Sequence, residues 1–105
     1  MDQNAAKFHV GQLVIHLKFN YRGVIFDVDP EFAGTEEWYE AMARSRPPKD
    51  RPWYHVLVDK ADHTTYVAER HLASDTTGLP INHPLVGSLF SGIRNGVYIG
   101  STPYN

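Results

Sequence analysis

The stretch Trp53-Tyr54-His55-Val56-Leu57-Val58 is the clearest β-strand in this sequence. Its aromatic and β-branched residues are the types enriched in strands, and no glycine or proline interrupts it. Successive side chains of a strand point to opposite faces, so Trp53 and Tyr54 lie on different sides of the sheet. At most one of them faces the main core. The other needs a cover, which an inserted helix, the C-terminal segment or a second subunit would supply.

Further strands are expected on both sides of this stretch. The two glycines Gly11 and Gly23 lie inside early strands, where glycine commonly marks a bulge or a sharp bend. Two such strands in close succession predict an antiparallel hairpin, and the bends favour a small, strongly curled barrel over a flat sheet. The predicted strands cover residues 8–16, 21–28, 53–58, 64–68 and 97–99.

A short helix is expected between the second and third strands. Thr35 is suited to cap it, Glu36 and Glu37 favour its first turn, and it is predicted to run through Ser45. Residues 45–52 hold three prolines and read as an extended loop. Beyond a single helical turn at 69–72, we expect an irregular C-terminal arm over residues 73–105, with a short turn at 84–90. The fold class is therefore mainly β with a helical insertion.

The length of 105 residues fits one domain, with its core at about residues 7–72. Cysteine is absent, which excludes disulfides, thiolate metal sites and a cysteine nucleophile. The N-terminus has no secretory signal pattern, and no apolar stretch approaches the ~20 residues of a membrane helix. We expect a soluble, cytoplasmic protein with no membrane partner.

The sequence offers no support for catalysis, because no nucleophile motif and no phosphate-binding loop is present. Six histidines are spread over different segments without the spacing of a metal site, so no metal and no cofactor is expected. Asp27 and Asp29 share one strand face, where two carboxylates would divide acid and base roles or bind a cation. A solvated strand face is the simpler interpretation, and a small metal-binding protein stays as a minor alternative.

Charge is segregated along a chain whose net charge is −2. Six acidic residues and no basic one lie between Asp27 and Glu40, whereas four basic residues follow at Arg44, Arg46, Lys49 and Arg51. This basic loop would contact DNA phosphates or an acidic protein surface. Alternatively, it offsets the neighbouring acidic helix within the same chain. Four charges would also be a small DNA footprint, with a salt slope of about −3.6.

Three aromatic residues, Trp38, Tyr54 and Tyr98, are candidates for a partner or oligomer interface, because aromatics are enriched at such contacts. Small curled sheets often cover an exposed face by self-association. The sequence therefore favours a homo-oligomer.

Four segments together resemble a known family. They are Lys7 to His16, Tyr21 to Pro30, Pro52 to Val58, and Tyr66-Val67-Ala68-Glu69 with Leu72, and an acidic insertion separates the second from the third. These residues are similar to the YccV-like, or HspQ, group of hemimethylated-DNA-binding and heat-shock proteins. The match weakens toward His83-Pro84 and Phe90, and residues 92–105 have no clear counterpart.

The resemblance implies a compact SH3-like β-barrel and a trimeric assembly. It also implies a stress-linked, non-enzymatic role in proteolysis, which includes turnover of the replication initiator DnaA and assistance to the ATP-dependent protease Lon. The alternative function is binding of hemimethylated DNA. The mild negative charge of the chain favours a regulator of proteolysis over a DNA-binding module, and the family's description keeps both open.

Overall fold

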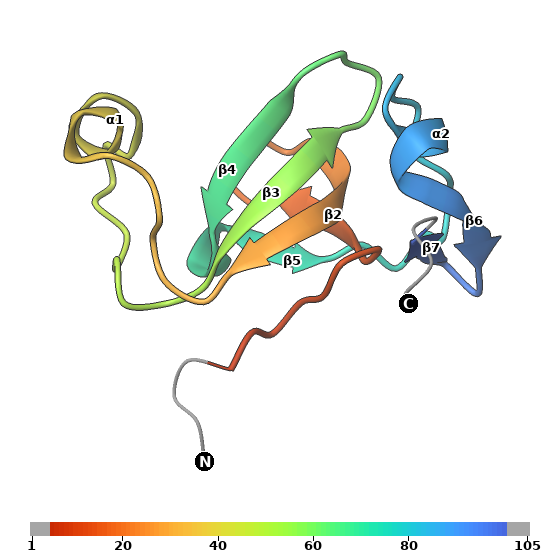
Figure 1. The fold of residues 1–105 in the computed structure, drawn as a ribbon, viewed down its shortest axis with the longest axis horizontal. Helices are drawn as coiled ribbons and strands as arrows, with labels where there is room; N and C mark the ends of the chain where they lie inside the picture. The colour runs from red at the N-terminus through yellow and green to blue at the C-terminus, as the bar shows by residue number, and fades with distance from the viewer. Residues whose placement is uncertain (1–4, 101–105) are drawn as a thin grey trace.

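A five-stranded antiparallel sheet forms the body of the protein, which a computed structural model describes over residues 5–100 (Figure 1). The strand order is β4-β3-β2-β1-β5, so β2 is central, with β3 and β1 on its two sides. The strands are β1 (Leu13–His16), β2 (Arg22–Asp29), β3 (Trp53–Val58), β4 (Thr64–Ala68) and β5 (Leu72–Ser74). A 3-10 turn, η1 (Glu69–His71), connects β4 to β5. Mainly β architecture is thus confirmed, and β5 is a strand that the sequence did not predict.

The strands predicted at 53–58 and 64–68 are confirmed at their bounds, and β2 lies one residue from its predicted start. β1 and β2 form the expected antiparallel hairpin. The bulge in β2 lies between Ile25 and Asp27, and not at a glycine. Gly23 has a different role, because a Cβ there would lie 2.4 Å from Val56 Cγ1 and 2.6 Å from the Leu57 carbonyl oxygen. It allows β3 to approach β2 closely.

The strand predicted over residues 8–16 is wrong in its first half. Gly11 has φ +92°, a conformation that ends an extended strand, and β1 begins only at Leu13. A Cβ at Gly11 would lie 2.2 Å from the carbonyl oxygen of Tyr98. The Gly11 carbonyl accepts a hydrogen bond from the Tyr98 N–H at 2.8 Å. Glycine is therefore needed where the C-terminal residues pack on the sheet.

The prediction of an irregular C-terminal arm is wrong beyond residue 85, although the strand predicted over 97–99 is confirmed. Residues 86–100 form a short helix and a hairpin, α2 (Val86–Leu89), β6 (Phe90–Arg94) and β7 (Val97–Gly100). Asn95 and Gly96 connect the two strands with positive φ values of 54° and 77°, as a two-residue hairpin turn requires. Figure 1 shows this hairpin on the side of the sheet away from the first helix. The last part of the predicted arm, 101–105, lies outside the described residues.

Buried side chains form clusters on both faces of the sheet, and Trp53 and Tyr54 belong to different ones, as predicted. One face buries Tyr54 with Phe8 and Val56, among others. The C-terminal hairpin covers a second cluster through Phe90 and Tyr98. The third cluster joins Trp53 to the inserted helix, and its buried members are Tyr39, Ala43, Trp53 and Ala68. The insertion is thus the cover that Trp53 needs.

The inserted helix α1 (Glu36–Met42) is shorter than predicted. Thr35 is its N-cap, as expected, and its hydroxyl accepts a hydrogen bond from the Trp38 N–H at 3.1 Å. The helix stands off from the sheet (Figure 1), and aromatic side chains fill part of the space between them. Within the described residues, β4 and β5 do not pair with each other, so hydrogen bonds do not close the sheet into a barrel. In the same range, no helix has the length and apolar content to cross a membrane.

Candidate functional site

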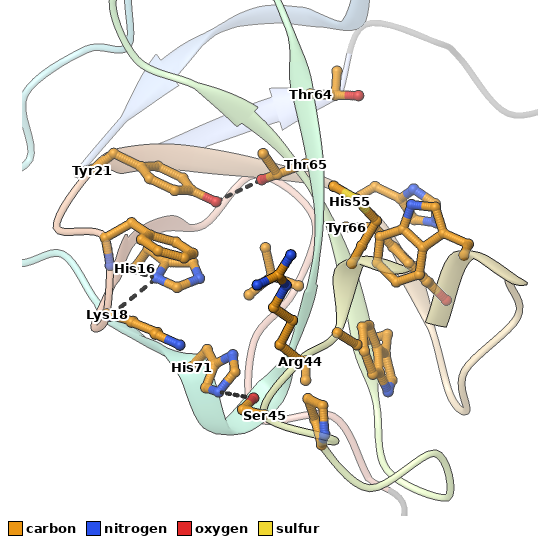
Figure 2. A pocket seen from close by; sticks show the side chains of 18 residues that line it. His16, Lys18, Tyr21, Arg44, Ser45, His55, Thr64, Thr65, Tyr66 and His71 are labelled. Carbon is orange, nitrogen blue, oxygen red and sulfur yellow. Dashed lines mark hydrogen bonds between the residues drawn. The ribbon is translucent and has the colours of Figure 1, made fainter. Parts of the chain in front are cut away.

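A cavity of about 470 Å³ lies between α1 and the sheet (Figure 2). The turn between β1 and β2 forms one wall, β4 forms the floor, and α1 with the loop that follows it forms the other wall. Two hydrogen bonds hold that loop to η1, namely Arg70 Nη2 to the Ser45 carbonyl at 2.7 Å and Ser45 Oγ with His71 Nε2 at 3.3 Å. The volume of the cavity is in the range of small-ligand sites.

His16 is the buried polar group of this cavity, with only 4% of its surface exposed. Its Nδ1 accepts hydrogen bonds from the backbone N–H groups of Lys18 and Phe19 at 3.1 and 3.0 Å. The ring is also stacked against Phe19 and Tyr21, with centroids 4.8 and 5.0 Å away. Since Nδ1 is an acceptor, the proton of the neutral ring is on Nε2. His16 thus ends β1 by ordering the turn that follows.

The Nε2 atom of His16 faces the cavity (Figure 2). No residue in the range 5–100 supplies it with a hydrogen-bond partner. Burial first, and then the nearby charges of His71 and Lys18, together lower the pKa of His16 from 6.5 to about 4. The pKa of His71 is also lowered, first by burial and then by Arg70 and Lys18. His16 is therefore a neutral Nε2–H donor at neutral pH.

Aromatic rings form the apolar wall of the cavity. Tyr66 of β4 lies against Trp53 and Trp38, at centroid distances of 5.2 and 5.5 Å. Its hydroxyl donates to Asp29 Oδ2 at 2.7 Å and accepts from the Ala33 N–H at 2.9 Å, which fixes the start of the insertion. Burial and the bond to the Asp29 carboxylate raise the pKa of Tyr66. Hydrogen bonds of its hydroxyl thus hold Tyr66 in place in this wall.

The mouth of the cavity is apolar and cationic. Phe19 and Met42 come from opposite walls, and 67% and 65% of their surfaces are exposed. Lys18 and Arg44 also line the cavity, and neither forms an ion pair with a residue that the structure describes. No aspartate or glutamate occurs among the described lining residues, although the chain holds twelve. The site is thus locally positive in a protein of negative net charge.

The structure separates the four basic residues of the predicted binding loop. Arg46 forms two hydrogen bonds to the Glu40 carboxylate, and its guanidinium lowers the pKa of that carboxyl. Lys49 pairs with Glu36. These two residues therefore offset the acidic helix within the chain, which was the alternative interpretation. Arg44 alone of the four lines the cavity described above, and Arg51 lies at the surface on the loop's far end.

The three aromatic residues predicted for an interface lie in different environments. Tyr54 is fully buried, and its hydroxyl donates to Glu69 at 2.7 Å and accepts from the Phe8 N–H at 3.2 Å. Tyr98 is 6% exposed, and its hydroxyl accepts from the Ile81 N–H. Contacts within one chain thus account for both. Trp38 is half-buried and lines the cavity, so it is the one of the three that offers surface to a partner.

The predicted carboxylate pair Asp27 and Asp29 meets His55, and one ligand atom from each lies within 4.8 Å of the others. This is the arrangement that the metal-binding alternative requires. Asp29 Oδ2, however, already accepts from His55 Nε2 at 3.0 Å and from the Tyr66 hydroxyl. These bonds tie the end of β2 to β3 and β4. A structural role accounts for the cluster as it stands.

Sequence reasoning missed His16, Lys18 and His71 as site residues, and it assigned Arg44 to an extended loop surface. A signal for His16 existed, because a histidine at the end of a strand followed by a four-residue turn is placed to accept from the turn's N–H groups. The cavity itself had no signal. It depends on how far α1 stands from the sheet, which no local pattern encodes.

The fold and the site define a small β-sheet protein with an inserted helix and one cationic, aromatic-walled cavity, which is the form of a binding domain. A family model described as "Hemimethylated DNA-binding protein YccV like" matches residues 6–97. The chain belongs to this YccV-like family, a family of DNA-binding and regulatory domains. The resemblance seen in the sequence is confirmed. The match also covers α2 and β6 and ends at Val97, the first residue of β7, so it extends beyond the segments that carried the resemblance.

Proposed function

We propose that the protein is a non-enzymatic, stress-related regulatory binding protein that modulates proteolysis by recognising polypeptide segments at the cavity. The observation that carries the proposal is the mouth of the cavity, where Phe19 and Met42 expose apolar surface on opposite sides. Exposed apolar groups gathered around a concave site mark interaction surfaces. Neutralisation of Arg46 and Lys49 by α1 supports a protein partner over DNA.

The expected partners are the Lon protease, its substrates, or both, with DnaA as one such substrate. In a degradation assay with the host's Lon protease, added protein should change the rate of substrate turnover. A Phe19→Ser/Met42→Ser variant should need about thirtyfold more protein for the same effect, because the two contacts are worth about 1 kcal/mol each. Leu79→Ser is the matched control, since Leu79 is 58% exposed and lies outside the cavity. Turnover that is unchanged by the wild-type protein would reject the proposal.

Binding of hemimethylated DNA is the second candidate function, and the family's description favours it. A titration of hemimethylated against unmethylated duplex at two salt concentrations tests it. Preferential, salt-sensitive binding to the hemimethylated duplex would support it. Equal and negligible binding to both duplexes would reject it, as would unchanged binding by an Arg46→Ala/Arg51→Ala variant.

The proposal includes the finer features that the resemblance implies. The order β4-β3-β2-β1-β5, with a 3-10 turn before β5, supports an SH3-like, strongly curled barrel in a single domain over residues 1–105. A cytoplasmic location and a homo-oligomer, with a trimer as the suggested state, belong to the same proposal. Light scattering of the purified protein gives its mass in solution, and a monomeric mass would reject the oligomer.

A further inference from the structure

We propose that the cavity between α1 and the sheet binds the C-terminal carboxylate of a partner polypeptide whose last side chain is apolar or aromatic. The inference rests on the proposed protein-binding function and names the chemical group that the site recognises. Its basis is the combination of a buried donor, two unpaired cations and an aromatic wall in one cavity.

The buried donor is His16. Its Nδ1 is occupied by two backbone N–H groups, and its Nε2–H points into the cavity without a protein partner in residues 5–100. Among the described residues no fully buried side-chain nitrogen or oxygen lacks a partner, so Nε2 is reached by solvent from the cavity, and a ligand with an oxygen acceptor would replace that water. A carboxylate supplies two such oxygens.

The electrostatics of the cavity select an anion. Lys18 and Arg44 contribute two positive charges, and Figure 2 shows the Arg44 side chain directed into the space in front of His16. The guanidinium group matches a carboxylate with two parallel hydrogen bonds. No carboxylate of the described residues lines the cavity to compete for these groups. A neutral ligand would leave the two positive charges without a counter-charge, and a cationic ligand would be repelled.

The rest of the cavity selects an apolar side chain. Trp38, Trp53 and Tyr66 form one wall, and the methylthio end of Met42 lies at the mouth. A volume of about 470 Å³ exceeds what a single side chain fills, so one apolar residue and its terminal carboxylate fit together. The exposed side chains of Phe19 and Met42 at the mouth then provide apolar surface for the partner residues that precede its C-terminal residue. This open, apolar mouth favours a chain end over a free small acid, which an enclosed pocket would bury on most sides.

The test compares three probes by calorimetry with the full-length protein. They are a hexapeptide, Gly-Ser-Gly-Ala-Leu-Phe, with a free C-terminus, the same peptide as its C-terminal amide, and N-acetylphenylalanine. We expect the free peptide to bind about tenfold or more tightly than the amide, because the amide loses the charge-assisted hydrogen bonds. We also expect it to bind more tightly than N-acetylphenylalanine. In NMR spectra, the Nε2 signal of His16 should shift when the free peptide is added.

Variants separate the site from general charge effects. Arg44→Gln should weaken binding of the free peptide about fivefold, as expected for an exposed ion pair of about 1 kcal/mol. Arg46→Gln removes the same charge from the same loop, but Arg46 is paired with Glu40 and lies outside the cavity, so its effect should be smaller than twofold. Both positions are exposed, so neither change should prevent folding.

Three results would overturn the inference. Equal binding of the free peptide and its amide would show that the carboxylate is not recognised. Equal binding of the peptide and N-acetylphenylalanine would assign the cavity to small organic acids. Equal effects of Arg44→Gln and Arg46→Gln would place the binding elsewhere. None of these results decides the Lon degradation assay, so failure of this inference and failure of the proposed function can be told apart.

Discussion

Trp53→Ala is expected to lower the free energy of unfolding by about 3–5 kcal/mol, as large aromatic-to-alanine changes in protein cores do. Trp53 is 2% exposed and is the centre of the third cluster, where its ring contacts Phe32 edge-on at 4.9 Å and Tyr66 at 5.2 Å. Its indole N–H also donates to the Pro48 carbonyl at 3.0 Å. The change removes both the packing of the insertion and one of its hydrogen bonds. Urea unfolding followed by far-UV circular dichroism measures the loss.

The effect should be concentrated in the insertion. α1 has seven residues and would not be stable alone, so it depends on the cluster around Trp53. Hydrogen exchange should therefore show the largest loss of protection in residues 32–52, and a smaller one in β1 and β2. Trp53→Phe keeps most of the packing and removes the hydrogen bond, so it should cost about 1–2 kcal/mol. A Trp53→Ala protein within 1 kcal/mol of wild type would contradict this account.

The central part of the sheet was predictable from the sequence. In β3, four of the six residues are Trp, Tyr or Val, types that favour strands, and the alternation of Trp53 and Tyr54 between faces follows from strand geometry. The Thr35 cap was predictable for a similar reason, since it is local chemistry. Features that depend on a few neighbouring residues thus appear in the sequence pattern.

One strand of the C-terminal hairpin, β7, was predictable from the sequence, whereas β6 was not. Asn95-Gly96 is a strong two-residue turn pair, but β6 carries Ser91, Gly92 and Arg94 and lacks the apolar run expected of a strand. Its pairing is stabilised by packing of Phe90 and Tyr98 on the sheet, which is a long-range contact. The need for glycine at position 11 also depends on a long-range contact, because a Cβ there would meet the carbonyl oxygen of Tyr98, which is distant in sequence.

The candidate site was predictable only in part. The charge pattern identified the basic loop, but pairing with Glu36 and Glu40 could be decided only by the position of the loop on α1. Arg44 and Arg46 are only two residues apart, but Arg44 lines the cavity whereas Arg46 pairs with Glu40. The cavity collects residues from four separate segments, and its donor, His16, is defined by a turn and by burial together. Such a site is a property of the tertiary structure.

His16 is expected to make the protein less stable as the pH falls from about 6.5 to 4. The folded pKa of about 4 lies below the unfolded value of 6.5, so in this window the unfolded chain binds a proton that the folded chain does not. Stability therefore rises with pH through the window and is fully present above 6.5. The shift corresponds to about 2–3 kcal/mol at this one residue. The charged and titratable groups around it are Lys18, His71, Tyr21 and Arg44.

The comparison of wild type with His16→Gln isolates this contribution, because glutamine does not titrate and its amide oxygen can accept from the turn. Between pH 7.5 and 4.5, the wild-type free energy of unfolding should fall about 2 kcal/mol more than that of the variant. NMR titration gives an independent reading, with a wild-type His16 pKa near 4 and the neutral ring protonated at Nε2. A pKa near 6.5, or a neutral ring protonated at Nδ1, would contradict the assignment. A neutral ring protonated at Nδ1 would also remove the Nε2–H donor on which recognition of a carboxylate depends, so this titration tests the geometry of the cavity before any ligand is added.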